Sequence, residues 1–108
     1  MRALHGLLDR AEAALSQLEG TPFEGQARLA LLAIYERSRD WPHAAGIARK
    51  MHDAHQGDFS TRQAHYLCEQ ALALIAQGDL PGAQALLDQA VAAAPDAARA
   101  RIELARLQ

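Results

Sequence analysis

A short segment with the pattern Asp-x-Pro-x-Ala occurs twice in this chain and constrains the fold more than any other feature. Residues 40–44 read DWPHA, and residues 79–83, thirty-nine positions later, read DLPGA. In each copy the Asp can cap a helix, and the Pro stands in the first turn, where its missing N–H costs little. Each copy lies between two stretches with helical periodicity. We therefore predict a helical repeat protein, a class that forms extended binding surfaces rather than enclosed reaction chambers.

The composition favours an all-α fold within one domain of 108 residues. Half of the residues are apolar but only five are aromatic, and the excess is Ala and Leu. That balance is typical of closely packed helices rather than strands. We predict a tetratricopeptide-repeat helical array, an α-solenoid fragment of about six antiparallel helices.

Charge and cysteine content argue against several classes of function. The formal net charge of −2 gives no basis for binding nucleic acid or an anionic membrane surface. A single cysteine, Cys68, excludes an internal disulfide and a Cys-based zinc cage. No apolar run approaches the roughly 18 residues that a bilayer requires, and the first residues do not lead into a signal-peptide core. We expect a soluble chain with no direct membrane insertion, no metal and no cofactor.

The expected helices span about residues 4–18, 22–38, 41–54, 61–77, 80–93 and 96–108. Gly20 and Gly78 are natural helix stops. We also expect two capping boxes, Thr21 with Glu24 and Ser60 with Gln63. Apolar residues from Leu4 to Leu18, including Leu7, are predicted to form one apolar stripe of the first helix, which we expect to be partly uncovered where no neighbouring repeat lies against it.

The second half of the chain resembles the tetratricopeptide repeat if Ala64 is its first position. The matching positions are Ala71, Leu74, Gly78, Ala83, Leu87, Ala90 and Pro95. Small residues there let two antiparallel helices approach closely. The first copy is degenerate, because Arg39 replaces the usual Gly and no Pro lies near Gln56. A longer loop around residues 56–60 explains the spacing, which exceeds the usual ~34 residues.

In this register the single repeat domain 1–108 divides into a partial repeat 1–24, repeats 25–60 and 61–97, and a partial repeat 98–108. Because each repeat needs a neighbour to cover its apolar face, we expect a fragment of a longer array. We expect that the exposed end faces allow copies of this chain to associate as a homo-oligomer.

Four segments carry a more specific resemblance. Residues 31–44 read LLAIYERSRDWPHA, residues 64–71 read AHYLCEQA, residues 78–80 read GDL, and residues 6–12 read GLLDRAE. Packing alone does not demand the Ile-Tyr-Glu and Asp-Trp pairing of the first segment or the Ala-His-Tyr-x-Cys-Glu pattern of the second. The four segments resemble the lipopolysaccharide assembly protein B family. The resemblance implies a bacterial inner-membrane protein with an N-terminal membrane helix, cytoplasmic tetratricopeptide repeats and a C-terminal rubredoxin-like metal domain. It also implies an adaptor role, in which a membrane-bound AAA+ protease degrades the deacetylase of the lipid A pathway. The membrane helix and the paired CxxC motifs do not occur in these 108 residues.

In tetratricopeptide arrays the first helix of each pair lines the concave face. The predicted binding face consists of Gln26, Leu29, Ala33, Glu36, His65, Cys68, Leu72, Ile75, Arg99, Ile102 and Arg106. Leu72 and Ile75 are the expected apolar contacts, and Arg99 and Arg106 the charged anchors. The face lacks the Lys and Asn set that clamps a C-terminal carboxylate. The alternative is that the apolar pair is ordinary packing and the arginines a solvated face.

Three smaller constellations have structural interpretations that we favour. His52 and His55 have a spacing suited to a metal, but exposed histidines at a helix C-terminus are the stronger interpretation. Cys68 with His65 could form a nucleophile and base, yet no orienting group or oxyanion loop is visible, so a buried cysteine is favoured. We expect Trp41 to pack over the preceding helix rather than to anchor a partner.

These observations favour a protein-binding adaptor segment that is not an enzyme. Two alternatives stay open, a structural spacer and a generic peptide-binding tetratricopeptide protein. An enzyme that uses Cys68 and His65 is a third, and it requires Cys68 to be exposed and reactive.

Overall fold

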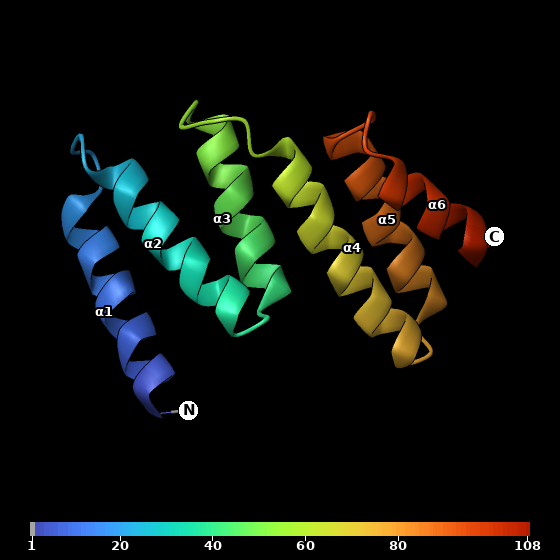
Figure 1. Cartoon of the computed structure of the whole chain (residues 1–108), viewed down its shortest axis with the longest axis horizontal. Coiled ribbons are helices and arrows are strands. Elements are labelled where there is room, and N and C mark those ends of the chain that lie inside the picture. Colours follow the sequence, from blue (N-terminus) through green and yellow to red (C-terminus); the bar gives the residue numbers. More distant parts are fainter. Residues whose placement is uncertain (1) are drawn as a thin grey trace.

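The computed structural model describes the backbone of residues 2–108 and the side chains of residues 6–108. The helices are α1 (Arg2–Leu18), α2 (Glu24–Arg37), α3 (Trp41–Asp53), α4 (Ser60–Ala76), α5 (Leu80–Ala93) and α6 (Ala98–Leu107). Each runs antiparallel to the one before it and packs against it, so the helices form a flat row of 45 × 32 × 16 Å (Figure 1). The predicted all-α array of six helices is confirmed, and residues 2–108 contain no strand.

The two Asp-x-Pro segments begin α3 and α5 as predicted. The Asp40 carboxylate accepts a hydrogen bond from the backbone N–H of His43 at 3.4 Å, and Asp79 accepts one from Gly82 at 3.0 Å. Both prolines lie in the first helical turn, where an N–H would have no helical partner. The repeat seen in the sequence is therefore a repeated helix start.

The capping box predicted at Thr21 does not form, because the chain makes a further turn before α2 begins. Phe23, not Thr21, precedes the helix. The Thr21 hydroxyl accepts from the N–H of Phe23 at 3.3 Å, and the Glu24 carboxylate accepts from the N–H of Gly20 at 2.9 Å. The same polar side chains therefore satisfy donors of the loop instead of donors of the helix.

The second predicted capping box, Ser60 with Gln63, is also wrong. Ser60 is already the first residue of α4, and no side chain caps the helix at Phe59. Asp58 instead accepts from the backbone N–H of Ser60 at 3.2 Å and from its hydroxyl at 2.7 Å. In the predicted box the Gln63 amide oxygen would accept from the Ser60 N–H, and a carboxylate is a stronger acceptor than an amide oxygen, so Asp58 takes this donor.

Four helix ends share a left-handed residue, and the one after α3 is His55, with φ 57°. Gly20 has φ 78° after α1 and Gly78 has φ 84° after α4, as predicted for helix stops. Arg39, which follows α2, has φ 55°. The degenerate position of the first repeat thus keeps the backbone conformation of a glycine while it carries a long side chain.

The loop between α3 and α4 is tied back to α2. The Gln56 side chain donates to the Glu24 carboxylate at 3.0 Å and accepts from Arg28 at 3.0 Å. Phe59, at the end of this loop, is buried. The extra length predicted around residues 56–60 is therefore an ordered connection that is fastened to α2 of the first repeat.

A single apolar core runs along the row and crosses from one helix pair to the next. Its centre combines alanines at helix contacts with a few large side chains. The fully buried alanines are Ala44, Ala48, Ala71, Ala83 and Ala90, and the largest fully buried side chains are Tyr66, Leu32, Met51, Leu87 and Cys68. These alanines let neighbouring backbones approach, as the repeat pattern predicts.

The apolar stripe of α1 is only partly covered. Leu8, Ala11 and Leu15 pack against the core, and Leu7 is 44% exposed, as expected for an end helix with part of its apolar face uncovered. Only α2 contacts α1, so a stripe of this width exceeds the surface that one neighbour covers. The side chain of Leu4 lies outside the described residues. Among the described helices, none is long and apolar enough to cross a membrane.

Candidate functional site

The predicted binding face lies on α2, α4 and α6, and over half of its side chains are exposed. The exposed members are Gln26, Leu29, Ala33, His65, Ile102 and Arg106. Leu29 and Ile102 are 44% and 51% exposed although both are large and apolar. Exposed apolar side chains at equivalent repeat positions are candidates for partner contact.

The central helix α4 presents a different surface from the one expected. Cys68 is 1% exposed and belongs to the core, so a partner cannot contact its side chain. Ile75 packs against that core and Leu72 is half-buried. The packing interpretation therefore holds for Cys68 and Ile75. The reason is that α4 contacts three other helices, α3, α5 and α6, whereas α2 and α6 each contact two.

The Cys68–His65 pair does not have the surroundings of a nucleophile and base. Burial raises the pKa of the Cys68 thiol, which favours the unreactive neutral form. The His65 ring nitrogen Nδ1 lies 2.6 Å from an Arg99 nitrogen. The favoured interpretation of Cys68 as a buried core residue is confirmed.

Arg99 joins α6 to α4 instead of standing as an uncommitted anchor. Its guanidinium donates to the Glu69 carboxylate at 2.6 Å and contacts His65. Arg106 is different, because its side chain is 73% exposed and meets only Glu103 of the same helix, at 3.4 Å. Of the two predicted charged anchors, Arg106 is the accessible one.

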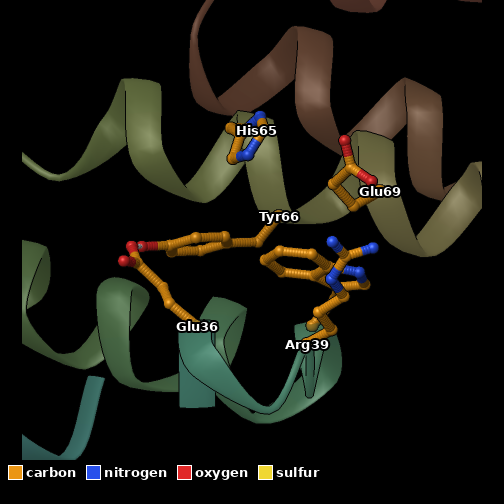
Figure 2. A pocket seen from close by; sticks show the side chains of 6 residues that line it. Glu36, Arg39, His65, Tyr66 and Glu69 are labelled. Carbon is orange, nitrogen blue, oxygen red and sulfur yellow. Dashed lines mark hydrogen bonds between the residues drawn. The ribbon is translucent and has the colours of Figure 1, made fainter. Parts of the chain in front are cut away.

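A pocket of about 500 Å³ opens between the two repeats, where α2 and α4 diverge. The Cα atoms of α2 and α4 stay more than 8 Å apart, while α4 and α6 are in direct contact. The pocket is lined by Glu36, Arg39, Trp41, His65, Tyr66 and Glu69 (Figure 2). Glu36 and His65 belong to the predicted binding face, so the pocket opens beside it.

Stacked aromatic rings form one wall of this pocket. The Trp41 ring lies on the Tyr66 ring with centroids 6.0 Å apart and planes 19° from parallel, and it meets the edge of His65. These ring partners are on α4, so the Trp41 ring packs against the following repeat, a contact that was not predicted. The wide spacing of α2 and α4 leaves room for the indole between repeats.

One tyrosine hydroxyl links α2 to α1, and another links α4 to α2. Tyr66 of α4 donates to Glu36 of α2, and Tyr35 of α2 donates to Glu12 of α1 at 3.2 Å. Burial and the facing carboxylate raise the pKa of both tyrosines, for Tyr35 to about 12. Both phenols therefore stay neutral and act as donors at physiological pH.

Sequence reasoning missed Arg39, Trp41, Tyr66 and Glu69 as members of one site. All six pocket residues nevertheless lie in the two runs, 31–44 and 64–71, that carry the specific family resemblance. The signal available in the sequence was that these two runs match the family at residues that packing alone does not demand. The sequence did not indicate that the turn between α2 and α3 lies close to α4 of the next repeat.

His52 and His55 are exposed at the end of α3, as favoured. His52 lies 3.8 Å from Asp58. Within the described residues, no group of three His, Cys, Asp or Glu side chains is placed to hold a metal ion.

Comparison with known proteins supports the resemblance found in the sequence. No protein-family model matches the chain. Lipopolysaccharide assembly protein B of Escherichia coli K12 is 35% identical over 103 residues, which cover 94% of this chain and 26% of that protein. The proteins of the same name from strains O6:H1 and O157:H7 match equally well. The predicted similarity to this family is confirmed, and the chain spans about a quarter of the length of these relatives.

Proposed function

We propose that this chain is a protein-binding segment of the tetratricopeptide type within a lipopolysaccharide assembly adaptor. The similarity to lipopolysaccharide assembly protein B along 94% of the chain carries the proposal. The arrangement of α2, α4 and α6 supports it, because their equivalent positions leave Leu29 and Ile102 uncovered. An open face with apolar and charged side chains suits a protein partner rather than a small substrate.

The resemblance suggests which partners this face serves. They are a membrane-bound AAA+ protease and the deacetylase of the lipid A pathway, met at the cytoplasmic face of the bacterial inner membrane. In this role the chain performs no chemistry and holds one partner near the other. Affinity then comes from a few central contacts and from geometry, so substitutions on the face should weaken capture without unfolding the array.

Two charge reversals provide a matched test of the face. Arg106 on α6 and Arg49 on α3 have side chains 73% and 74% exposed, and each meets one carboxylate of its own helix. Arg49 is outside the predicted face. In the full-length protein, Arg106→Glu and Ile102→Glu should reduce capture of the purified deacetylase or protease about tenfold, while Arg49→Glu should not. Circular dichroism checks that helicity is retained.

The spacer alternative gives a different result in the same assay. A spacer should tolerate replacement of this segment by an unrelated repeat array of equal length. Capture that survives that exchange, together with indifference to Arg106→Glu and Ile102→Glu, would sink the proposal. Loss of capture on exchange supports it, because length and rigidity are then insufficient.

A further inference from the structure

The side chain at Arg39 stands where the backbone favours glycine. Its φ of 55° lies in the left-handed region, and the equivalent position of the next repeat is Gly78, with φ 84°. Left-handed conformations are uncommon for residues with a side chain and tend to occur at functional sites. A glycine at position 39 would satisfy the turn, so the turn alone does not explain an arginine there.

The guanidinium of Arg39 is the uncommitted charge of the inter-repeat pocket. Glu69 is paired with Arg99, and Glu36 accepts the Tyr66 hydroxyl. Among the side chains that the structure describes, Arg39 has no hydrogen-bond or ion-pair partner. Figure 2 shows it extending from the turn into the pocket, on the opposite side of the Tyr66 ring from the Glu36 carboxylate. The pocket thus has an available cation, while its Glu69 carboxylate is paired with Arg99 and its Glu36 carboxylate accepts a hydrogen bond from the neutral Tyr66 phenol.

We propose that Arg39 and Trp41 form a subsite for an acidic side chain, flanked by an apolar one, of a bound protein segment. This deepens the proposed function and rests on it. The guanidinium offers paired N–H donors that match a carboxylate in a bidentate geometry. The half-buried Trp41 ring, fixed on Tyr66, offers an apolar surface for the neighbouring side chain. A volume of about 500 Å³ accommodates side chains of this kind.

The direct probes are two blocked peptides, N-acetyl-Leu-Glu-Leu-amide and its Gln counterpart. Trp41 is the chain's one tryptophan, so its fluorescence and its indole N–H resonance report on the pocket alone. Millimolar Glu peptide should produce saturable changes in both signals, and the Gln peptide should bind about tenfold more weakly. Equal responses to the two peptides, or no response to either, overturn the subsite.

Variants at residue 39 separate binding from folding. Arg39→Gly should raise the urea midpoint, because the left-handed turn is relaxed, and should also abolish the preference for the Glu peptide. A midpoint that falls, or a preference that persists, contradicts the proposal. Arg37→Gln removes a cation two residues away, outside the pocket lining, and should leave peptide binding unchanged.

The same variants distinguish this subsite from the wider adaptor role. If Arg106→Glu reduces partner capture while Arg39→Gly does not, the binding face stands and the subsite fails. If the Glu peptide binds through Arg39 but the full-length protein captures neither partner, the adaptor role fails and the carboxylate subsite stands.

Discussion

Two junctions, at which one repeat meets the next, each contain an Asp-x-Pro turn, but the two junctions present different surfaces. At the first, the turn carries Arg39 and Trp41, and the indole stacks on Tyr66 of α4. At the second, the equivalent positions are Gly78 and Leu80, and Leu80 is 49% exposed. In the repeat register the counterpart of Tyr66 is Ala100, which offers no ring for Leu80 to contact.

This difference shows how side-chain size at one position sets the distance between helices. The buried Ala100 accompanies direct contact between α4 and α6. Tyr66 and Trp41 occupy the space between α2 and α4, whose Cα atoms stay more than 8 Å apart. The same Asp-x-Pro turn can therefore occur at a closed junction or at a junction with a pocket. The pocket forms where Trp41 and Tyr66 hold the helices apart.

Removing the two equivalent side chains should have very different effects. Trp41→Ala should lower the free energy of unfolding by about 2–3 kcal/mol, because the aromatic contact to α4 is lost. Leu80→Ala should change it by no more than about 0.5 kcal/mol, as for other exposed positions. Urea unfolding followed by circular dichroism measures both. Similar losses for the pair would remove the proposed asymmetry between junctions.

The tyrosine bridges should make the first half of the molecule sensitive to alkaline pH. The folded pKa of Tyr35 is about 12 and that of Tyr66 is also raised, against about 10 in the unfolded chain. A raised folded pKa means that the stabilisation is present below pH 10 and is lost as pH rises toward 12.

Tyr66→Phe should cost about 1.5 kcal/mol at neutral pH, the contribution of a hydrogen bond to a charged group. It should also flatten the decline of stability between pH 10 and 12. Unfolding curves at several pH values test this. A pH dependence identical to that of the original chain would contradict the bridge between Tyr66 and Glu36.

The left-handed turns provide a smaller test. Gly78→Ala should cost about 1 kcal/mol, because an added Cβ disfavours φ 84° although no atom lies within 4 Å of it. Thermal unfolding monitors the loss. Gly46→Ala, in the middle of α3 and equally open, is the control and should stabilise the helix slightly.

The smallest effect is expected at the ion pair of the second junction. Arg99→Ala should cost about 0.5 kcal/mol, since Arg99 and Glu69 are 39% and 27% exposed and water screens them. High salt should diminish the difference between variant and original chain. A loss as large as that of Trp41→Ala would mean that α6 depends on this pair rather than on Ala100 and its apolar neighbours.

The helix starts at Asp40 and Asp79 were predictable because capping is local. The carboxylate, the proline and the first N–H groups lie within four residues, so no distant part of the chain is needed. The capping boxes at Thr21 and Ser60 failed although they are also local. There a competing carboxylate or an additional turn redirected the same donors.

The site was predictable only in part. A helical register placed Gln26, Leu29 and Ala33 on an exposed stripe, because such a stripe follows from the 3.6-residue period. The register also placed Cys68 at an equivalent position, and the structure buries it. The exposure of a side chain depends on how many other helices its own helix contacts. The 3.6-residue period of the sequence does not indicate that number.

The sequence by itself determined the elements of this protein: six helices, their order, two equivalent starts and the alanine positions at which they approach. These follow from hydrogen bonds and apolar spacing within a few residues of each position. Only the tertiary structure decided that Trp41 contacts α4, that Arg99 contacts Glu69 and that a pocket opens at Arg39. Those contacts join residues about 25 to 30 positions apart, and they depend on the distance between repeats, which side-chain volumes across the junction set together.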